Sequence, residues 1–553
     1  MRLINALLLA LSPSLVASRG WPGAWDHGIH DTASFHQRDS VLQSRQAATF
    51  DWSAVTPSCR LEYHECYNGY KCARLKVPLD WSTANSSDCD TLSRFATIGI
   101  ATLPATVPET DPSFGGSVLI NPGGPGGLGT RMVRTLGPYL QGILEGERHY
   151  EMIGFDPRGV GTSTPRADCY GPPANRASDA DARYNMVSLD NDVGLQYTYQ
   201  DRLALGELCG QLGPDSILNH MSTASVARDM LEIVDRLNEL RRANSTSADQ
   251  AREPASTLQD TEKVIDFFYE TCFKAGEACP LKLSSDGSAS DIKGRVNSFI
   301  EGLVEFPVPI VAENRIRLIT PVLMRNAIRG LTYQPISSFE FLADLLAESL
   351  AGNYSLLLTS PEATAHLFDE SCGKVDRDQP QPDSSCADET DISVMCADTA
   401  ATNDDLDFAA ARNIRDRLTS QAPTVSEPWI RYTITCGGWK YKPPYSFAGP
   451  YGNQNLDTSR PENVPTAPPL ILSSRYDVAT PLRNAFALSE LYPGSSVVVQ
   501  ESYGHLALGS SPSACTSNYV RTYFDTGKLP PTGSTCNDDC PAAIPAVECP
   551  GYP

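Results

Sequence analysis

An aspartate and a histidine stand at the ends of two successive apolar stretches, an arrangement that suits proton transfer. Asp477 lies just beyond the apolar residues 469–473, and His505 follows Gly504 shortly after the apolar residues 495–500. Because the carboxyl ends of parallel strands meet at one edge of a sheet, we expect the two side chains to lie within hydrogen-bond distance. The histidine could then act as general base while the aspartate fixes its tautomer. The alternative is structural, with Asp477 supporting a turn and His505 solvated.

A glycine-rich loop at residues 121–127 is the second feature that could do chemistry. It directly follows a short apolar run at residues 117–120. Such a loop can turn backbone N–H groups toward a developing oxyanion, because glycine lets the backbone come close to a substrate. We predict Gly124 as one oxyanion donor, with Gly123 as the neighbouring alternative.

The same loop spells G-x-G-x-x-G at Gly124, Gly126 and Gly129, which is the pattern of a dinucleotide-binding turn. We reject that interpretation, because the acid that binds the ribose should lie about twenty residues further on. The next predicted strand ends at Asp156, 32 residues after Gly124, and runs straight into Pro-Arg-Gly at 157–159. We therefore expect no cofactor.

A metal site is not expected either. The eight histidines are scattered, and the chain has neither a paired C-x-x-C nor H-E-x-x-H. Arg158 and Ser163, which follow the strand that ends near Asp156, are predicted to hold that loop rather than to do chemistry.

A nucleophilic serine is what the sequence does not supply. Hydrolases built on such a sheet carry it in G-x-S-x-G, on a sharp turn between a strand and a helix, and no such motif occurs in the 553 residues. Its expected place, residues 243–257, has no strand-forming run and no glycine. A looser match at residues 347–351 lies inside a helical pattern, and Ser245 and Ser247 are loop serines. We name no nucleophile and predict that a strand, the turn and a helix are missing together.

The elements that must position these residues are read from hydrophobic periodicity. Strands are predicted at residues 72–81, 94–103, 117–120, 150–155, 469–473 and 495–500, and helices at residues 222–242, 262–273, 337–350, 482–491 and 516–524. Thr480 and Pro481 are expected to be the N-cap and first residue of the helix at 482–491. Strands with intervening helices predict an α/β fold with a largely parallel sheet.

Four motifs in this order resemble the secreted tripeptidyl-aminopeptidase branch of the serine α/β-hydrolases, relatives of the proline iminopeptidases. They are NPGGPGG at 121–127, FDPRGVGTS at 155–163, SRYDVATP at 474–481 and GH at 504–505, within a similarity over roughly residues 52–536. The resemblance implies a Ser-Asp-His triad under a helical cap. It also implies hydrolysis of amides or esters, with peptides split near a free N-terminus, and no cofactor.

The predicted domain order follows from these elements. Residues 1–18 read as a signal peptide and 19–47 as a leader; the hydrolase core comprises 48–257 and 431–536, interrupted by a helical cap at 258–430; and a Cys-containing tail covers 537–553. No later segment is apolar enough to span a membrane, so we expect no membrane contact after cleavage of the signal.

Composition points to a secreted protein. The 16 cysteines suit disulfides in an oxidising compartment, and Asn85, Asn244 and Asn353 head the three N-x-[ST] glycosylation sequons. A net charge of −22 argues against a nucleic-acid partner, because phosphate binding needs clustered Lys and Arg.

Three hypotheses for function remain open at this point. The first is a secreted serine aminopeptidase whose serine segment is omitted from the written sequence. The second is a non-catalytic remnant or binding protein, and the third is an esterase or amidase that acts on a small molecule. The expected partner is therefore a peptide or a small acyl substrate, and the oligomeric state stays open.

Overall fold

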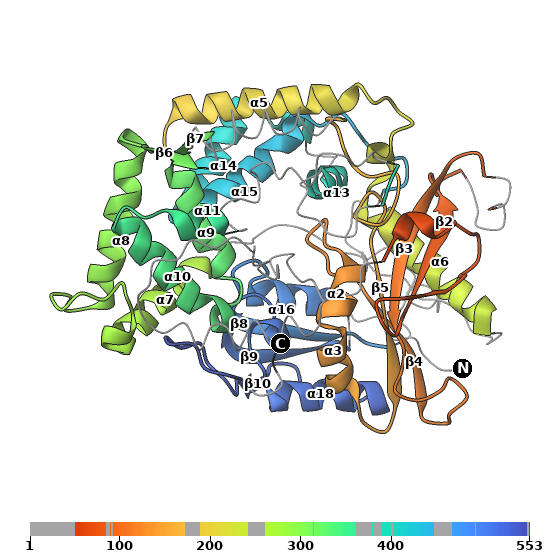
Figure 1. The fold of residues 1–553 in the computed structure, drawn as a ribbon. Coiled ribbons are helices and arrows are strands. Elements are labelled where there is room, and N and C mark those ends of the chain that lie inside the picture. Colours follow the sequence, from red (N-terminus) through yellow and green to blue (C-terminus); the bar gives the residue numbers. More distant parts are fainter. Residues whose placement is uncertain are drawn as a thin grey trace.

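The computed structural model describes residues 50–83, 89, 92–171, 188–241, 260–312, 315–360, 378–380, 389–399, 403–446, 467–492, 494–549 and 552. Asn85, Asn244 and the stretch at 243–257 lie outside these residues, as does the predicted signal peptide. Within them the chain forms two larger sheets, a two-stranded hairpin and an extensive layer of helices (Figure 1).

The first sheet has five strands in the order β1-β2-β3-β5-β4. Its strands are β1 (His64–Cys66), β2 (Tyr70–Pro78), β3 (Phe95–Leu103), β4 (Phe114–Ile120) and β5 (His149–Phe155). The pairs β1–β2, β2–β3 and β3–β5 are antiparallel, and only the pair β4–β5 is parallel. The prediction of a largely parallel sheet is wrong here. Parallel neighbours need a long crossover, whereas no described helix separates β1, β2, β3 and β4 along the chain.

The second sheet is parallel throughout and has the order β10-β9-β8. It comprises β8 (Leu470–Tyr476), β9 (Ser496–Tyr503) and β10 (Ser534–Asn537). Two crossover helices, α16 (Leu482–Leu491) and α18 (Ala514–Thr526), connect these strands, which is why they can run in parallel. The central strand β9 is buried along most of its length, as its Val-Val-Val run predicts.

The two sheets are not joined by strand pairing within the described residues. β4 is an edge of the first sheet and β8 is an edge of the second. Side chains of both edge strands nevertheless enter one hydrophobic cluster, which contains Val118 and Ile120 from β4 and Leu470 from β8. The expected single sheet is therefore divided into two that share a core.

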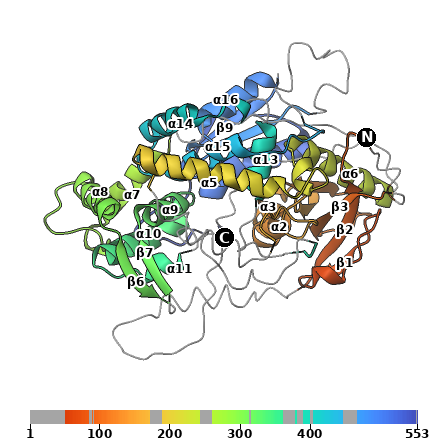
Figure 2. The same cartoon turned by 90° about the horizontal axis from the view of Figure 1, so that it is seen from above.

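Most remaining helices form a layer that we call the helical layer. It consists of α5 (Asp192–Gly210), α7 (Thr261–Ala275), α8 (Ala289–Glu305), α9 (Pro321–Leu331), α10 (Pro335–Leu350), α11 (Ser355–Thr359), α13 (Thr390–Asp398), α14 (Phe408–Gln421) and α15 (Ser426–Thr435). Figures 1 and 2 show α5 beside α14 and α15, although α5 precedes them by about 200 residues. Leu195 of α5 and Ile430 of α15 share one buried cluster.

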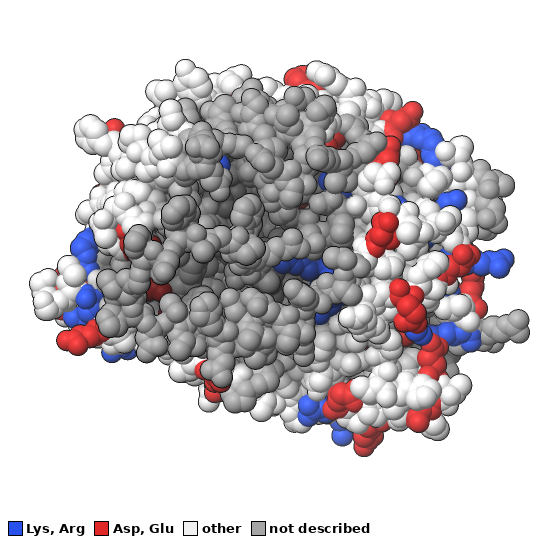
Figure 3. Space-filling model, viewed as in Figure 1, with Lys and Arg blue, Asp and Glu red and all other residues white. Residues whose placement is uncertain are grey.

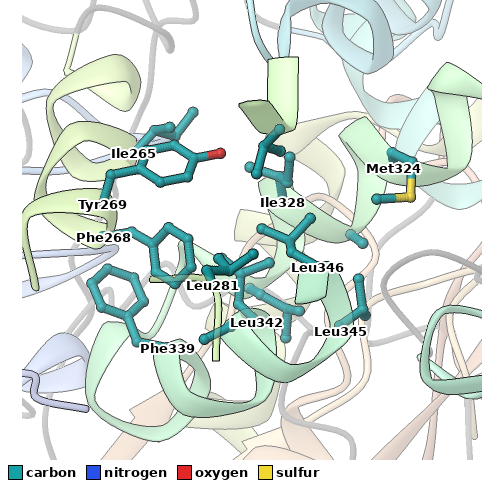
Figure 4. Close-up of a cluster of buried hydrophobic side chains, with 14 of the residues drawn as sticks. Ile265, Phe268, Tyr269, Leu281, Met324, Ile328, Phe339, Leu342, Leu345 and Leu346 are labelled. Atoms are coloured by element: carbon teal, nitrogen blue, oxygen red, sulfur yellow. The ribbon is translucent and has the colours of Figure 1, made fainter. Parts of the chain in front are cut away.

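A hairpin, β6 (Val308–Ala312) and β7 (Arg315–Ile319), interrupts the helical layer and was not predicted from the sequence. The core of this layer is a dense apolar cluster between α7, α9 and α10, in which Phe268, Met324, Leu342 and Leu346 are buried (Figure 4). Deleting one such side chain would cost roughly 2–5 kcal/mol of stability, so the layer has a substantial core of its own.

The other helices lie nearer the sheets. They are α2 (Gly129–Thr135), α3 (Gly137–Leu144), α6 (Thr223–Arg241) and α17 (Ala507–Ser510), with short 3₁₀ turns at Trp52–Ala54, Ile217–His220, Gly276–Ala278, Asn403–Asp405 and Cys436–Gly438. Among the described residues, none of the helices combines the length and the hydropathy that crossing a bilayer requires. On the face in Figure 3, acidic and basic side chains of the described residues are interspersed.

Seven disulfides cross-link the described chain, which confirms the predicted use of cysteine. The pairs are Cys59–Cys89, Cys66–Cys72, Cys169–Cys209, Cys272–Cys279, Cys396–Cys436, Cys515–Cys536 and Cys540–Cys549. Cys396–Cys436 ties α13 to the turn that follows α15, so it fixes part of the helical layer.

A buried ion pair ties α6 to the first sheet. The Arg158 guanidinium donates from Nε and Nη2 to Asp229 at 2.7 and 2.6 Å, and from Nη1 to the carbonyl of Leu79 at 2.7 Å. The indole N–H of Trp81 donates to the same Asp229 carboxylate at 2.9 Å.

Ser163 holds the same loop after β5. Its hydroxyl accepts from the Gly99 N–H at 3.0 Å and donates to the Asp156 carbonyl. Arg158 and Ser163 thus hold the loop that follows β5, as the sequence predicts.

Asp229→Ala is expected to lower the free energy of unfolding by about 3–5 kcal/mol, because it leaves the Arg158 charge buried without its counter-ion. The matched control is Glu501→Ala, which breaks the half-buried Arg475–Glu501 pair and should cost no more than about 1 kcal/mol. Urea denaturation measures both, and similar costs for the two variants would contradict this assignment.

Candidate active site

Asp477 and His505 meet at the carboxyl ends of the paired strands β8 and β9. The strands align Tyr476 with Tyr503, so the residues that follow each strand emerge at the same edge. His505 Nδ1 lies 2.9 Å from Asp477 Oδ1, and the two side chains are 7% and 1% exposed. The predicted hydrogen-bond proximity is confirmed.

The Asp477 carboxylate is fully saturated with donors. Oδ1 also accepts from the N–H groups of Ala479 and Thr480, and Oδ2 accepts from the Thr480 hydroxyl at 2.9 Å and the Leu506 N–H at 2.8 Å. Burial by itself raises the pKa of the Asp477 carboxyl, but His505 and the N–H donors outweigh it and hold that pKa below its ordinary value. Asp477 is therefore an anion that can orient an imidazole and stabilise it when it is protonated.

The predicted N-cap is displaced by one residue. Pro481 occupies the N-cap of α16, and the Thr480 hydroxyl is bonded to Asp477 instead. The carboxylate competes for the Thr480 hydroxyl and N–H because it is charged and buried.

Backbone strain and close packing hold the histidine loop in place. Gly504 has φ +109°, and a Cβ built there would lie 2.6 Å from Pro335 Cδ and 2.8 Å from the Tyr333 carbonyl oxygen. Leu506 adopts φ +71°, which is unusual for a branched side chain, and its N–H is thereby turned to Asp477. The His505 N–H donates to the Tyr333 carbonyl at 2.8 Å.

Tyr333 forms one wall of the site and was not predicted from the sequence. Its ring packs edge-on against the His505 imidazole, with a centroid separation of 5.3 Å. It follows α9 in the helical layer and is distant from His505 along the chain, so hydrophobic periodicity cannot pair the two.

The two glycines predicted as alternative oxyanion donors, Gly124 and Gly123, differ in the contacts of their N–H groups. The Gly123 N–H already donates to the Asn121 side chain at 3.2 Å. No described residue accepts a hydrogen bond from the Gly124 N–H, and Gly124 has φ +118°, a conformation that suits glycine alone. The backbone of the loop is braced separately by a hydrogen bond from the Gly127 N–H to the Gly123 carbonyl.

In the described part of the chain, no hydroxyl is hydrogen-bonded to His505 Nε2. Three serines near the histidine loop, Ser474, Ser502 and Ser510, are buried and hydrogen-bonded to one another, so none is presented to a substrate. The described residues thus bring together the orienting aspartate and the base, without a nucleophile.

The described residues offer one group of metal-ligand types, Cys169, Cys209 and Glu389. The two cysteines form a disulfide, which removes the thiolates that a metal would need, and Glu389 accepts from the Cys169 N–H at 2.7 Å. The cluster is structural.

The described residues on the two sides of residues 242–259 contact different sheets. Arg241, at the end of α6, contacts Ser117 of β4 and Glu151 of β5, both in the middle or first half of their strands. The chain is next described at α7, where the Thr261 hydroxyl donates to the carbonyl of Val478, just past the end of β8. Arg241 therefore lies against the body of the first sheet, and Thr261 lies at the edge of the second sheet where Asp477 follows β8.

The chain has an α/β fold with a buried Asp–His pair at one edge of its parallel sheet. Residues 422–536, which contain Asp477 and His505, match the family described as TAP-like protein. Carboxylesterase B of Mycobacterium tuberculosis is 35% identical over 162 residues, which is 29% of this chain and 28% of that protein. Serine protease Hip1 of the same organism is 23% identical over 523 residues, or 85% of this chain and 87% of that protein.

The family match covers residues 422–536 alone, and the relative that aligns with most of the chain is 23% identical, so these matches show a similarity to TAP-like serine hydrolases. The match to carboxylesterase B covers 28% of that relative, so it is a similarity between parts of the two proteins.

The stability of the Asp477→Asn variant tests the charge state of Asp477. Because the folded-state pKa is depressed, the carboxylate contributes stability above its unfolded pKa of about 3.9, and that contribution is lost as pH falls through the folded value. The gap in melting temperature between wild type and Asp477→Asn should therefore be large at pH 7 and shrink below about pH 4. Glu277→Gln, at an exposed site, is the control. A melting-temperature gap between wild type and Asp477→Asn that widens below about pH 4 would contradict a lowered pKa of Asp477.

Proposed function

We propose that this chain represents a secreted serine hydrolase of the tripeptidyl-aminopeptidase type, which acts on peptides near a free N-terminus, with Asp477 and His505 as the acid and base of its triad. The observation that carries the proposal is the buried hydrogen bond between these two side chains at one edge of β8 and β9. In the proposed mechanism a serine attacks the carbonyl, and His505 takes its proton and returns it to the leaving group. Gly124 donates one hydrogen bond to the oxyanion.

Peptide hydrolysis is favoured by the longer of the two relationships. Serine protease Hip1 aligns with most of the chain, whereas carboxylesterase B aligns with about a quarter of it. The second candidate is an esterase or amidase for a small acyl substrate, which the higher local identity to carboxylesterase B supports. Both would use the same Asp477, His505 and Gly124.

We further propose that the written sequence omits the strand and elbow that carry the serine, and that the helical layer is the cap. Three observations support this interpretation: the absence of G-x-S-x-G from the sequence, the break between β4 and β8, and the contacts of Arg241 with the first sheet and of Thr261 with the second. A non-catalytic remnant would share these features, so the gene itself is decisive.

The 553-residue protein is expected to be inactive. Loss of the serine removes the covalent path, and loss of its strand removes the second oxyanion amide as well. Fluorophosphonate labelling of the purified chain should give no adduct. Labelling at any serine would contradict the proposal that the segment with the nucleophilic serine is omitted from these 553 residues.

Genomic DNA around codons 252–258 discriminates an omitted coding segment from a remnant. An open frame there that encodes an apolar strand followed by G-x-S-x-G would show that the segment was left out as an intron. If no such frame exists, the remnant becomes the better account.

Secretion is proposed from the signal segment, the sequons and the seven disulfides. Asn353, the one sequon asparagine within the described residues, is exposed in the turn between α10 and α11, and its side-chain oxygen accepts from the Ser355 N–H at 3.1 Å. Expression in a secreting eukaryotic host should give a glycan at Asn353, seen as a mass that an amidase for N-glycans removes and that Asn353→Gln lacks. A cytosolic product with free thiols would contradict secretion.

A further inference from the structure

Helix α7 brings a half-buried aromatic ring to the edge of the second sheet that carries Asp477 and His505. The ring of Phe267 is stacked on the ring of Tyr503, with a centroid separation of 3.9 Å and an interplanar angle of 12°. The Tyr503 ring also lies 4.7 Å from the ring of Tyr476. Phe267 therefore contacts the end of β9 directly and the end of β8 through one further ring.

The two strands need support at this end, because their pairing is irregular just before it. Ser474 of β8 is aligned with Gln500 of β9. Tyr476 is aligned with Tyr503, so β9 has one residue more than β8 between these two pairs. An extra residue of this kind disrupts the ladder locally. The last pair is thus separated from the regular ladder, and beyond it the Gly504 N–H donates to the Tyr476 carbonyl at 2.9 Å.

The same helix also holds the aspartate side of this edge. The Thr261 hydroxyl donates to the carbonyl of Val478, the residue after Asp477, at 3.0 Å. The Lys263 ammonium lies 5.1 Å from the centroid of the Tyr476 ring, within the range of a cation–π contact. The first two turns of α7 therefore contact the ends of both strands that lead to the site.

The position of Tyr503 bears directly on the histidine. Only Gly504 separates the two residues, and the backbone of a glycine resists rotation less than that of any other residue. The chain that enters the histidine loop is therefore held by whatever fixes Tyr503. Stacked rings stabilise more than the area they bury, and their geometry is directional. The stack with Phe267 thus fixes where the end of β9 lies.

We propose that Phe267 is a positioning residue of the candidate active site. Its stack on Tyr503 keeps the last pair of β8 and β9 in register, and thereby keeps the His505 imidazole within hydrogen-bond distance of Asp477. The inference rests on the proposed function, since it takes His505 as the base. Phe267 acts through Tyr503 and touches no substrate in this role, so the helical layer supplies part of the geometry of the Asp–His pair.

The proton between His505 Nδ1 and Asp477 reports this geometry, because it is shielded from water only while the hydrogen bond is formed. Its far-downfield resonance is recorded by proton NMR on the 553-residue protein and assigned by its loss in His505→Gln. In Phe267→Leu the rate at which this proton exchanges with water should rise about two- to tenfold, the range that corresponds to the loss of one aromatic pair.

Phe273→Leu is the matched control. Phe273 is also half-buried, lies on α7 and packs on the same apolar cluster, but its ring faces the Lys282 ammonium at 4.9 Å. Phe273→Leu should lower the melting temperature about as much as Phe267→Leu and leave the exchange rate unchanged. Phe267→Tyr, which keeps the ring, should also retain the wild-type rate.

Equal exchange rates in wild type and Phe267→Leu overturn the inference. An equal rise in Phe273→Leu overturns it too, because it shows a general loss of stability. A wild-type protein without a resolved resonance has no ordered hydrogen bond to position, which also contradicts the inference. If Phe267→Leu does not fold, Tyr503→Leu removes the same stack from the other side and must give the same rise. The proposed function fails separately, through a fluorophosphonate adduct in the 553-residue protein.

Discussion

The parallel pairing of β8 with β9 is the interaction on which the site depends. Because Tyr476 is aligned with Tyr503, Asp477 and His505 leave the sheet side by side, although 28 residues separate them. The rest of the site then stabilises one buried charge. Four N–H and O–H donors besides His505 surround the Asp477 carboxylate, and one of them, from Leu506, requires a strained backbone. A carboxylate held in this manner keeps the imidazole in one orientation and one tautomer.

The edge of β8 opposite β9 has no paired strand among the described residues. Parallel sheets of this class are buried on both faces and continuous, because unpaired strand edges leave backbone groups without partners. Within the described residues β4 and β8 are both edges, and they are connected by side chains such as Val118 and Leu470 rather than by strand pairing. The proposed omission of a central strand would account for this break and for the lack of a G-x-S-x-G motif.

Local patterns in the sequence predicted much of the fold. The helix at residues 482–491 agrees with α16 at both ends, and every predicted strand is present with shifts of a few residues, because apolar runs bounded by turn residues are local signals. Strand direction in the first sheet, the β6–β7 hairpin and the packing of α5 on α15 were not predicted, since they depend on contacts between distant segments.

Some residues of the candidate site could be predicted from the sequence, and others could not. The proximity of Asp477 and His505 could be predicted because each follows a strand, whereas Tyr333 follows a helix and reaches His505 only through the packing of distant segments. The preference for Gly124 over Gly123 needed the hydrogen bond from Gly123 to Asn121, which sequence alone does not show.

Amide hydrogen exchange across the strands tests the central claim, that a strand is absent between β4 and β8, most directly. Strands β5 and β9 have paired neighbours on both sides and serve as internal standards. Peptides that cover residues 114–120 and 470–476 should exchange in two phases, with about half of their amides fast, because in a strand paired on one edge alternate N–H groups point away from the neighbour. Uniform slow exchange in all four strands would show a continuous sheet and contradict the account.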